Sequence, residues 1–444
     1  MTSLTESRHS VPEDVLRQLA RTGAGKRATA LLIAGQHSKR LLLLRGVLDL
    51  APPGEAAAHW DLLEAAEARD PQALRTVLHY PAVGAWAVRT LGRLRAGLAP
   101  TADFGYLGAV AAAACLRAGV PFRMGLRTYG PLLVLPTLGA LRLPGGPTEV
   151  VVSGEAGVLR LAAPGGHPVE AAASPYDGTW RSADLRWRSL HLLPGGVALD
   201  DIDPYRAPDD ATGRLLLSGP LPQAELRAWR GLWQGSTAVL RHIDPERLAE
   251  RADLLLAINP LDPASATGSA TDRAAFGSVL ARRQPSALRF AALLVHELAH
   301  NKLTALCDLA PLHTAGPERR HWAPWRPDPR PFDGLVQGVY AHLSLADFWQ
   351  RAALADGLPD DGRELAWGEY ATSVEQVRAV LPTIADSDQL THAGGEFMME
   401  LAAKHAALRH VPPPPAHHAR AVAELTARRA HWVRQFPDGF AGGP

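Results

Sequence analysis

The feature that most constrains the fold of this 444-residue chain is a long apolar segment without a helix breaker, from Ala287 to Leu309. Ser286 stands directly before the segment as a helix N-cap, and Pro311 stands just after it as a stop. Alanine, leucine and valine fill positions 291–295, directly before a polar group at its centre. A helix with so much apolar surface has to be buried against other elements. The sequence therefore predicts a core helix that carries polar residues into the interior.

The polar group is His296-Glu297-Leu298-Ala299-His300, an H-E-x-x-H motif. On a helix, residues four apart lie on one face with their side chains ~6 Å apart, so both imidazoles can reach one metal ion. Glu297 points roughly a quarter turn away, where it can hold a water molecule or orient a ligand. Buried groups of this kind must be paired or bound to metal, because unpaired burial costs free energy. A hydrogen-bonded pair of core histidines is the alternative interpretation.

A metal site needs a third protein ligand, and the sequence offers several. The extended pattern H-E-x-x-H-x-x-G-x-x-H is not followed, because Leu303 and Leu306 occupy the positions of its Gly and last His. His342 is the preferred candidate, since it lies in the breaker-free apolar run GLVQGVYAHLSLADFW, which predicts a second buried helix packed on the first. A hydrogen-bonded core histidine is again the alternative. The other downstream candidates are Asp308, His313, Glu318, His321 and Asp333.

Three neutral imidazoles leave half of an octahedral metal open. This suits a redox-active iron that takes a bidentate co-substrate and dioxygen, and it also suits a catalytic zinc with one water. The loop from Trp322 to Pro331 holds Arg326 and Arg330 between prolines and beside two tryptophans. A rigid pair of arginines can bind a small dicarboxylate such as 2-oxoglutarate. A surface loop with arginine stacked on tryptophan is the alternative.

The whole chain predicts an α+β fold that is mainly helical. Residues 1–120 read as a helical N-terminal region, and 121–205 as a β-rich region with antiparallel pairing, because short apolar runs are separated by Gly-Gly and Pro-Gly pairs. Residues 206–444 form the predicted helical metal-binding region that carries the HExxH motif. Asp200, Asp201 and Asp203 are expected to cap turns, since their spacing lacks the glycine and distal glutamate of a calcium loop.

Charge and composition exclude several partner classes. The 46 basic and 45 acidic side chains give a net charge of +1, which predicts neither a nucleic-acid nor an anionic-membrane partner. No run approaches the ~18 apolar residues of a membrane span, and the N-terminus is polar, so we expect a cytoplasmic protein. Cys115 and Cys307 lie in apolar helical contexts, which predicts two buried free thiols.

Short motifs spread over nearly the whole chain resemble one family when they are taken together in order. They are SKRLLLLR from Ser38, HYP from His79 with GAW from Gly84, LPTLG from Leu135, DIDPYR from Asp201, AFG from Ala275, HELAHNKL from His296, PWR from Pro324, DPRP from Asp328 and QGVYAH from Gln337. With these motifs the chain resembles the HExxH-type, 2-oxoglutarate-dependent peptide β-hydroxylases of ribosomally synthesised and post-translationally modified peptide (RiPP) clusters.

The resemblance implies an iron(II) dioxygenase that uses 2-oxoglutarate and O2 to hydroxylate a β-carbon in a side chain of a ribosomal precursor peptide. It implies His296, His300 and His342 as metal ligands, and Arg326 or Arg330 as the group that holds 2-oxoglutarate. Other enzymes of the same RiPP maturation would be further partners.

Two departures from the family pattern concern the metal surroundings. Leu298 and Ala299 stand where a bulkier pair is expected, which alters packing beside the metal, and Pro327 replaces a common acidic residue. Two other functions stay open. A zinc metallopeptidase would use Glu297 as general base for a zinc-bound water. A peptide-binding scaffold with a degenerate site would bind no divalent metal.

Overall fold

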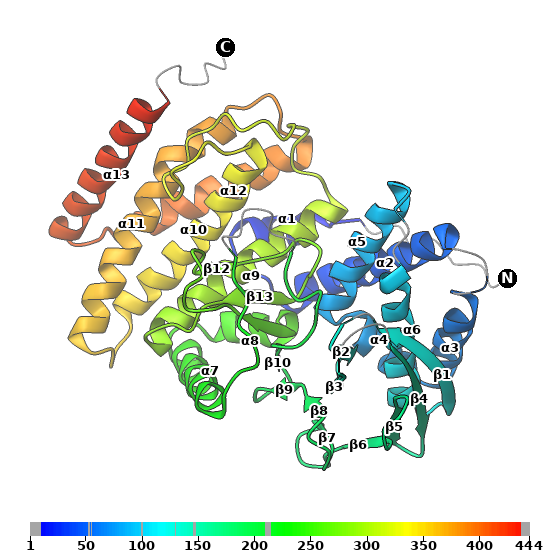
Figure 1. Cartoon of the computed structure of the whole chain (residues 1–444). Helices are drawn as coiled ribbons and strands as arrows, with labels where there is room; N and C mark the ends of the chain where they lie inside the picture. Colours follow the sequence, from blue (N-terminus) through cyan, green and yellow to red (C-terminus); the bar gives the residue numbers. More distant parts are fainter. Residues whose placement is uncertain are drawn as a thin grey trace. The chain divides into compact units, whose positions relative to one another are not determined.

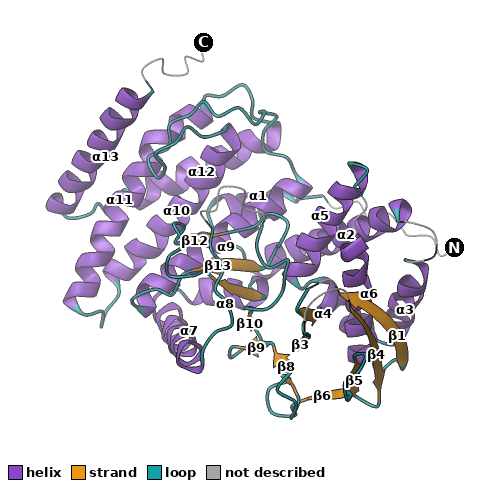
Figure 2. Ribbon diagram, viewed as in Figure 1, coloured by secondary structure: helices purple, strands orange, loops and turns teal. Residues whose placement is uncertain are grey.

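The computed structural model describes residues 10–436 except 52–53, 55, 99–100, 129, 145–147 and 209–214. The polar stretch 1–9, on which the expectation about the N-terminus rests, lies outside the described residues. The contacts divide the chain into two compact units that are each discontinuous in sequence. The first contains Met1–Gly35, Leu232–Leu254 and Gln284–Pro444, and the second contains Gln36–Gly231 and Leu255–Arg283. Figure 1 colours the elements by their order along the chain, and Figure 2 colours them by type of secondary structure.

The first unit is helical. Helix α9 packs against α8 and α10, α10 packs against α11 and α12, and α11 also packs against α13. Helix α1 packs against α12, so elements from near the two ends of the described chain lie together in this unit. The helices of this unit are α1 (Glu13–Ala20), α8 (Pro245–Leu254), α9 (Ala287–Leu309), α10 (Phe332–Leu354), α11 (Asp360–Ala385), α12 (His392–Leu408) and α13 (Pro415–Gln435), with parts of α2 (Lys26–Leu50) and α7 (Gln223–Ile243).

The second unit combines helices with three sheets. Its core helix, α6 (Thr101–Ala118), carries an alanine-rich run that is buried and packs on α3, α4, β1, β2 and β4. The other helices are α3 (Ala57–Arg69), α4 (Pro71–Leu78) and α5 (Pro81–Arg95). The strands are β1 (Phe122–Thr128), β2 (Leu132–Leu135), β3 (Gly139–Arg142), β4 (Thr148–Glu155), β5 (Val158–Ala162), β6 (Val169–Ala173), β7 (Trp180–Arg181), β8 (Trp187–Ser189), β9 (His191–Leu192), β10 (Ala198–Leu199), β11 (Ala257–Pro260), β12 (Ser269–Ala270) and β13 (Ser278–Ala281).

Two of the sheets are antiparallel, in the orders β1-β4-β5-β6-β7 and β2-β3-β8. The third, β12-β13-β11-β10-β9, is mixed, because β11 pairs in parallel with both β10 and β13. The prediction of a mainly helical α+β fold with an antiparallel β region is therefore confirmed. Both parallel pairs involve β11, which lies outside residues 121–205; of its two partners, β10 lies inside that range and β13 outside it.

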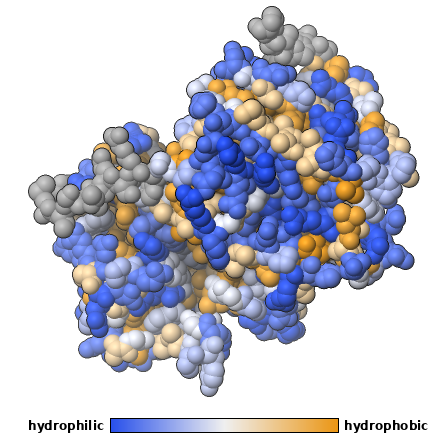
Figure 3. Space-filling model, turned by 180° about the vertical axis from the view of Figure 1, so that it is seen from behind, coloured by the Kyte–Doolittle hydropathy of each residue, from blue (hydrophilic) through white to orange (hydrophobic). Residues whose placement is uncertain are grey.

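Three smaller expectations can be compared with the structure. The carboxylate of Asp200 accepts hydrogen bonds from the backbone N–H groups of Ile202 and Asp203, so its predicted turn-capping role is confirmed. Both cysteines are free thiols, but only Cys115 is buried. The prediction of a buried Cys307 is wrong, because this residue lies on a partly exposed side of α9. Among the described residues, none of the helices has the length and apolarity that a membrane span requires. Hydrophilic residues cover much of the face shown in Figure 3.

Candidate metal centre

Helix α9 begins and ends where the sequence predicts. The Ser286 hydroxyl accepts a hydrogen bond from the backbone N–H of Arg289 at 3.3 Å, and the helix ends at Leu309, before Pro311. His296 and His300 lie one turn apart on this helix, with their ring centroids 4.8 Å apart and their planes at 81°. Their Nε2 atoms face each other at 3.2 Å. The motif therefore brings two imidazole nitrogens to one point, as its spacing predicts.

This separation of the two nitrogens matches that of two ligands on one metal ion. With metal–nitrogen bonds of ~2.1 Å, two ligand nitrogens lie ~3.4 Å apart on a tetrahedral ion and ~3.0 Å apart at adjacent octahedral positions. The observed 3.2 Å lies between these values. The distance is compatible with two ligands on one metal ion and equally with a hydrogen bond between the two rings, which is the alternative interpretation of the motif.

The third predicted histidine lies beside this pair, on the second buried helix. The ring of His342 on α10 meets the ring of His296 edge to face, with centroids 5.3 Å apart. Its Nδ1–H donates to the carbonyl oxygen of Gly338 at 2.8 Å, which leaves the lone pair on Nε2. His300 is held in the same way, since its Nδ1 faces Oε1 of Gln337 at 3.1 Å. Such outer hydrogen bonds fix the tautomer in which Nε2 can bind a metal.

The electrostatic surroundings keep two of these rings neutral. Burial, together with the nearby His300, lowers the pKa of His296 to about 3. Burial and the neighbouring His296 lower the pKa of His342 to about 3, against the opposing effect of the hydrogen bond to Gly338. The Nδ1 atom of His296 is buried and has no hydrogen-bond partner. Neutral imidazoles are the form that coordinates a metal.

The side chains as they stand do not form a complete ligand set. Within the part of the chain that the structure describes, no three or more His, Cys, Asp and Glu side chains are arranged so that they could hold a metal ion. The pair of facing Nε2 atoms on α9 is thus joined by a third ring in contact rather than by a third converging nitrogen. The donor set fits a metal in its chemistry, and the assignment of His342 as a ligand stays a prediction.

Three of the other downstream candidates lie together near the start of α10. His313 lies 3.4 Å from Asp333, measured between Nε2 and Oδ1. The rings of His313 and His321 both contact Phe332 at the start of α10, with centroid distances of 5.2 and 5.9 Å. Glu297 is 2% exposed on α9, and its chemical role stays a prediction.

The two loop arginines are joined by a carboxylate that the sequence analysis left without a role. Nε of Arg326 lies 3.1 Å from Oδ1 of Asp328, and Nη1 of Arg330 lies 3.4 Å from Oδ2 of the same residue. Burial raises the pKa of Asp328, but Arg326 and Arg330 outweigh this effect and leave the pKa below its ordinary value. The arginines thus flank an internal anion, which an incoming dicarboxylate would have to displace from at least one of them. The Arg-x-Asp-x-Arg spacing is the sequence signal for this arrangement.

A tryptophan of the same loop lies directly on the histidine cluster. The indole of Trp325 stacks on the ring of His342, with centroids 4.5 Å apart and planes 20° apart. A Cβ atom at Gly338, one helical turn before His342, would overlap this indole. Gly338 therefore provides both the space for Trp325 and the carbonyl that orients His342. A glycine within an apolar helix is the signal for such a close approach.

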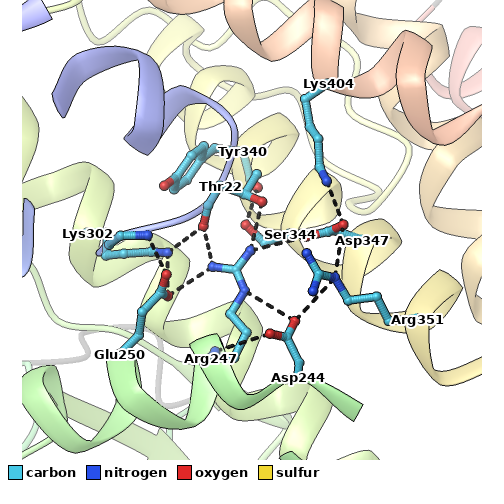
Figure 4. Close-up of polar contacts among 11 residues, drawn as sticks. Thr22, Asp244, Arg247, Glu250, Lys302, Tyr340, Ser344, Asp347, Arg351 and Lys404 are labelled. Carbon is cyan, nitrogen blue, oxygen red and sulfur yellow. Dashed lines mark hydrogen bonds and ion pairs between the residues drawn. The ribbon is translucent and has the colours of Figure 1, made fainter. Parts of the chain in front are cut away.

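A buried charged cluster fastens the two histidine-bearing helices to their neighbours (Figure 4). Lys302, two residues beyond the motif, donates to Oε2 of Glu250 at 2.8 Å and to the carbonyl of Thr22 at 2.7 Å. Arg247 donates to the same Glu250 oxygen at 2.9 Å and to Oγ1 of Thr22 at 2.7 Å. On α10, Asp347 accepts from Lys404 of α12 at 2.7 Å.

Arg247 links the two halves of this cluster, because its Nη2 lies 3.7 Å from Oδ2 of Asp347. The contacts therefore run from α9 through α8 to α10 and α12, with Thr22 between α1 and α2 as a further partner. Buried charges are retained when they are paired and hydrogen-bonded in this manner. The cluster sets how α9 and α10 lie against each other, and with them the histidine rings.

Gln337, Gly338, Trp325 and Asp328 lie in motifs that the sequence analysis names, but the structure alone shows that each contacts a predicted site residue. Comparisons with known proteins do not assign the chain to a family. A scan against models of known protein families gave no match to the chain, and a search of curated proteins found no match to it either.

Proposed function

We propose that this protein is an iron(II)- and 2-oxoglutarate-dependent hydroxylase that acts on a β-carbon of a side chain in a ribosomally synthesised precursor peptide. The observation that supports a metal enzyme is the pair of Nε2 atoms of His296 and His300 at 3.2 Å, with the ring of His342 in contact. The resemblance of the sequence motifs supports the choice of iron and of a peptide substrate. We expect the reaction to take place in the cytoplasm, with other enzymes of the same RiPP maturation as further partners.

Within this proposal, His296, His300 and His342 hold the metal through Nε2. Gln337 and Gly338 keep two of these rings in the required tautomer by accepting their Nδ1 protons. Bound iron, with 2-oxoglutarate and O2, would supply the oxidising power to hydroxylate an unactivated C–H bond while 2-oxoglutarate becomes succinate and CO2. Arg326 or Arg330 would pair with the distant carboxylate of 2-oxoglutarate by giving up its contact with Asp328.

The test is anaerobic reconstitution with iron(II), followed by 2-oxoglutarate, O2 and the precursor peptide. We expect the peptide to gain the mass of one oxygen atom, with one succinate formed for each modified peptide. Succinate without modified peptide would show that the substrate is wrong, and peptide fragments without succinate would overturn the hydroxylase.

A zinc metallopeptidase is the second candidate, because the nitrogen spacing also suits a tetrahedral zinc and Glu297 belongs to the same motif. In that case zinc alone would support peptide cleavage, and Glu297→Gln would abolish it by removing the general base. The hydroxylase instead predicts that succinate formation depends on iron and that no cleavage occurs with zinc.

A further inference from the structure

A cavity of about 220 Å³ lies between the arginine loop and α13, within the first unit. Its lining residues are Trp322, Pro324, Trp325, Arg326, Pro327, Arg428, His431 and Trp432. Drug-sized ligands occupy pockets of ~300 Å³ or more, so this space suits one large side chain or a comparably small group.

The lining combines apolar walls with hydrogen-bond donors. Three indoles and two prolines form the walls. Arg326 and Arg428 are exposed residues that also line the cavity, and Arg326 already contacts Asp328. Trp432 is 7% exposed, and its indole N–H is buried without a hydrogen-bond partner. As far as the chain is described, no acidic side chain belongs to the lining. A matching ligand therefore has an apolar body that fills the cavity and anionic acceptor groups beside it.

The cationic charge near the cavity extends along α13. Arg429, next to Arg428, lies over the ring of Trp322 at 4.4 Å. Nη1 of Arg428 donates to the carbonyl of Pro324 at 3.2 Å, which ties this helix to the loop and fixes the guanidinium at the cavity. An arginine that is already positioned loses less conformational entropy when it binds a carboxylate.

We infer that this cavity binds an aromatic side chain of an acidic peptide, with a carboxylate beside that side chain paired to Arg428. Trp325 connects this site to the histidine cluster, since one indole both lines the cavity and stacks on His342. A peptide anchored here is held one aromatic ring away from the proposed metal centre. The inference rests on the proposed function in taking a peptide as the substrate, and it names an acidic and aromatic segment as what is recognised.

The experiment measures peptide binding to the full-length, metal-free protein by calorimetry, so that it needs neither iron nor turnover. The probe is a peptide with blocked ends and a Glu-Phe-Glu centre, compared with the same peptide carrying Gln-Phe-Gln or Glu-Ala-Glu. We expect both replacements to weaken binding at least fivefold, because one removes the anions and the other the aromatic ring. Equal affinity for all three peptides, or no binding of the first, would overturn the inference.

Two variants locate the binding at the cavity. Arg428→Gln should weaken binding of the Glu-Phe-Glu peptide about five- to tenfold, because it removes a charge-assisted hydrogen bond. Arg434→Gln, an exposed arginine on the same helix that does not line the cavity, should leave the affinity unchanged. Equal weakening by both variants would show that only the general charge of α13 matters and would refute the site. Trp432→Phe, which keeps an aromatic ring but removes the pyrrole part of the indole with its N–H, should weaken binding about threefold.

Competition with free 2-oxoglutarate tests whether this site is distinct from the co-substrate site. We expect millimolar 2-oxoglutarate to leave peptide binding unchanged, and competitive displacement of the peptide would overturn the inference. Since binding is measured without metal, an intact affinity in a protein that never hydroxylates would refute the proposed function alone.

Discussion

The indole of Trp325 and the imidazole of His342 stack at a centroid distance of 4.5 Å, and this contact exists only because residue 338 has no side chain. The loop that carries the predicted co-substrate arginines is thereby in direct contact with a predicted metal ligand. A substitution of Trp325 should therefore alter the position of the His342 ring, and a substitution of His342 should alter the position of the Trp325 ring.

Replacing Gly338 by alanine tests this contact. Its Cβ would overlap the indole of Trp325, so we expect Gly338→Ala to displace the loop, to destabilise the fold by ~1–3 kcal/mol and to weaken iron binding at least tenfold. Calorimetric titration with iron(II) under argon and thermal unfolding measure the two effects. Gly395→Ala is the matched control, because a Cβ there meets nothing within 4 Å on helix α12. That variant should be neutral or slightly stabilising.

Removal of the third imidazole tests the ligand set. We expect His342→Ala to abolish stoichiometric iron(II) binding, because two histidines alone leave the metal weakly held. His392→Ala, at an exposed position of α12, should bind iron normally. Metal analysis after gel filtration measures the iron content, and an unchanged content in His342→Ala would show that this ring is not a ligand.

Substitutions in the arginine loop should change the required 2-oxoglutarate concentration in two opposite directions. Arg326→Ala or Arg330→Ala should raise the 2-oxoglutarate concentration needed for half-maximal succinate formation by tenfold or more, depending on which residue pairs with the co-substrate. Asp328→Asn should lower that concentration, because it removes the internal anion that both arginines contact. Wild-type kinetics in both arginine variants would mean that neither residue binds 2-oxoglutarate.

The buried charged cluster should contribute strongly to stability. Glu250→Ala leaves Lys302 and Arg247 buried without their shared carboxylate, and we expect a loss of ~3–5 kcal/mol in the free energy of unfolding. Glu246→Ala, at an exposed position of the same helix α8, should change it by less than ~0.5 kcal/mol. Urea denaturation followed by circular dichroism compares the two variants, and similar values for both would contradict a structural role of the cluster.

The second unit should lose stability as the pH rises. Burial, followed by the nearby Asp200, raises the pKa of Asp203 from 3.8 to about 7. The folded state therefore holds this proton more tightly than the unfolded chain, so the stabilisation is complete below pH 3.8 and is lost as the pH rises through 7. The loss amounts to at most ~4 kcal/mol.

Asp203→Asn is the variant that isolates this effect. It keeps a side-chain oxygen for the backbone N–H of Tyr205 and cannot ionise, so the free energy of unfolding should change less between pH 5 and pH 8 than in the wild type. Denaturant titrations at the two pH values measure the difference. An identical pH dependence in both proteins would show that Asp203 does not titrate in this range.

The sequence predicts the local features of the site well, because they depend on neighbouring residues. The N-cap at Ser286, the breaker-free helix behind it and the facing nitrogens of His296 and His300 all follow from spacing within one helix. Packing of α10 on α9 follows from the apolar run around His342, which cannot remain exposed.

The remaining features depend on partners that are far apart along the chain. Glu250 and Lys302 are 52 positions apart, and neither local sequence predicts that the two residues are in contact. The fit of Trp325 against Gly338 arises only when the loop returns to α10, and its orientation is set by the fold of the whole unit. The parallel partners of Ala257 on β11 are Ala198 and Ser278, which lie 59 and 21 positions away, and no local pattern predicts either pairing.

The hydrogen bond from Lys302 to the carbonyl of Thr22 joins positions 280 residues apart. Thr22 is therefore synthesised 280 residues before the ammonium group from which its carbonyl accepts. Because the first unit combines Met1–Gly35 with residues from Gln284 onward, its N-terminal helices can complete their packing only after the motif helix has been synthesised.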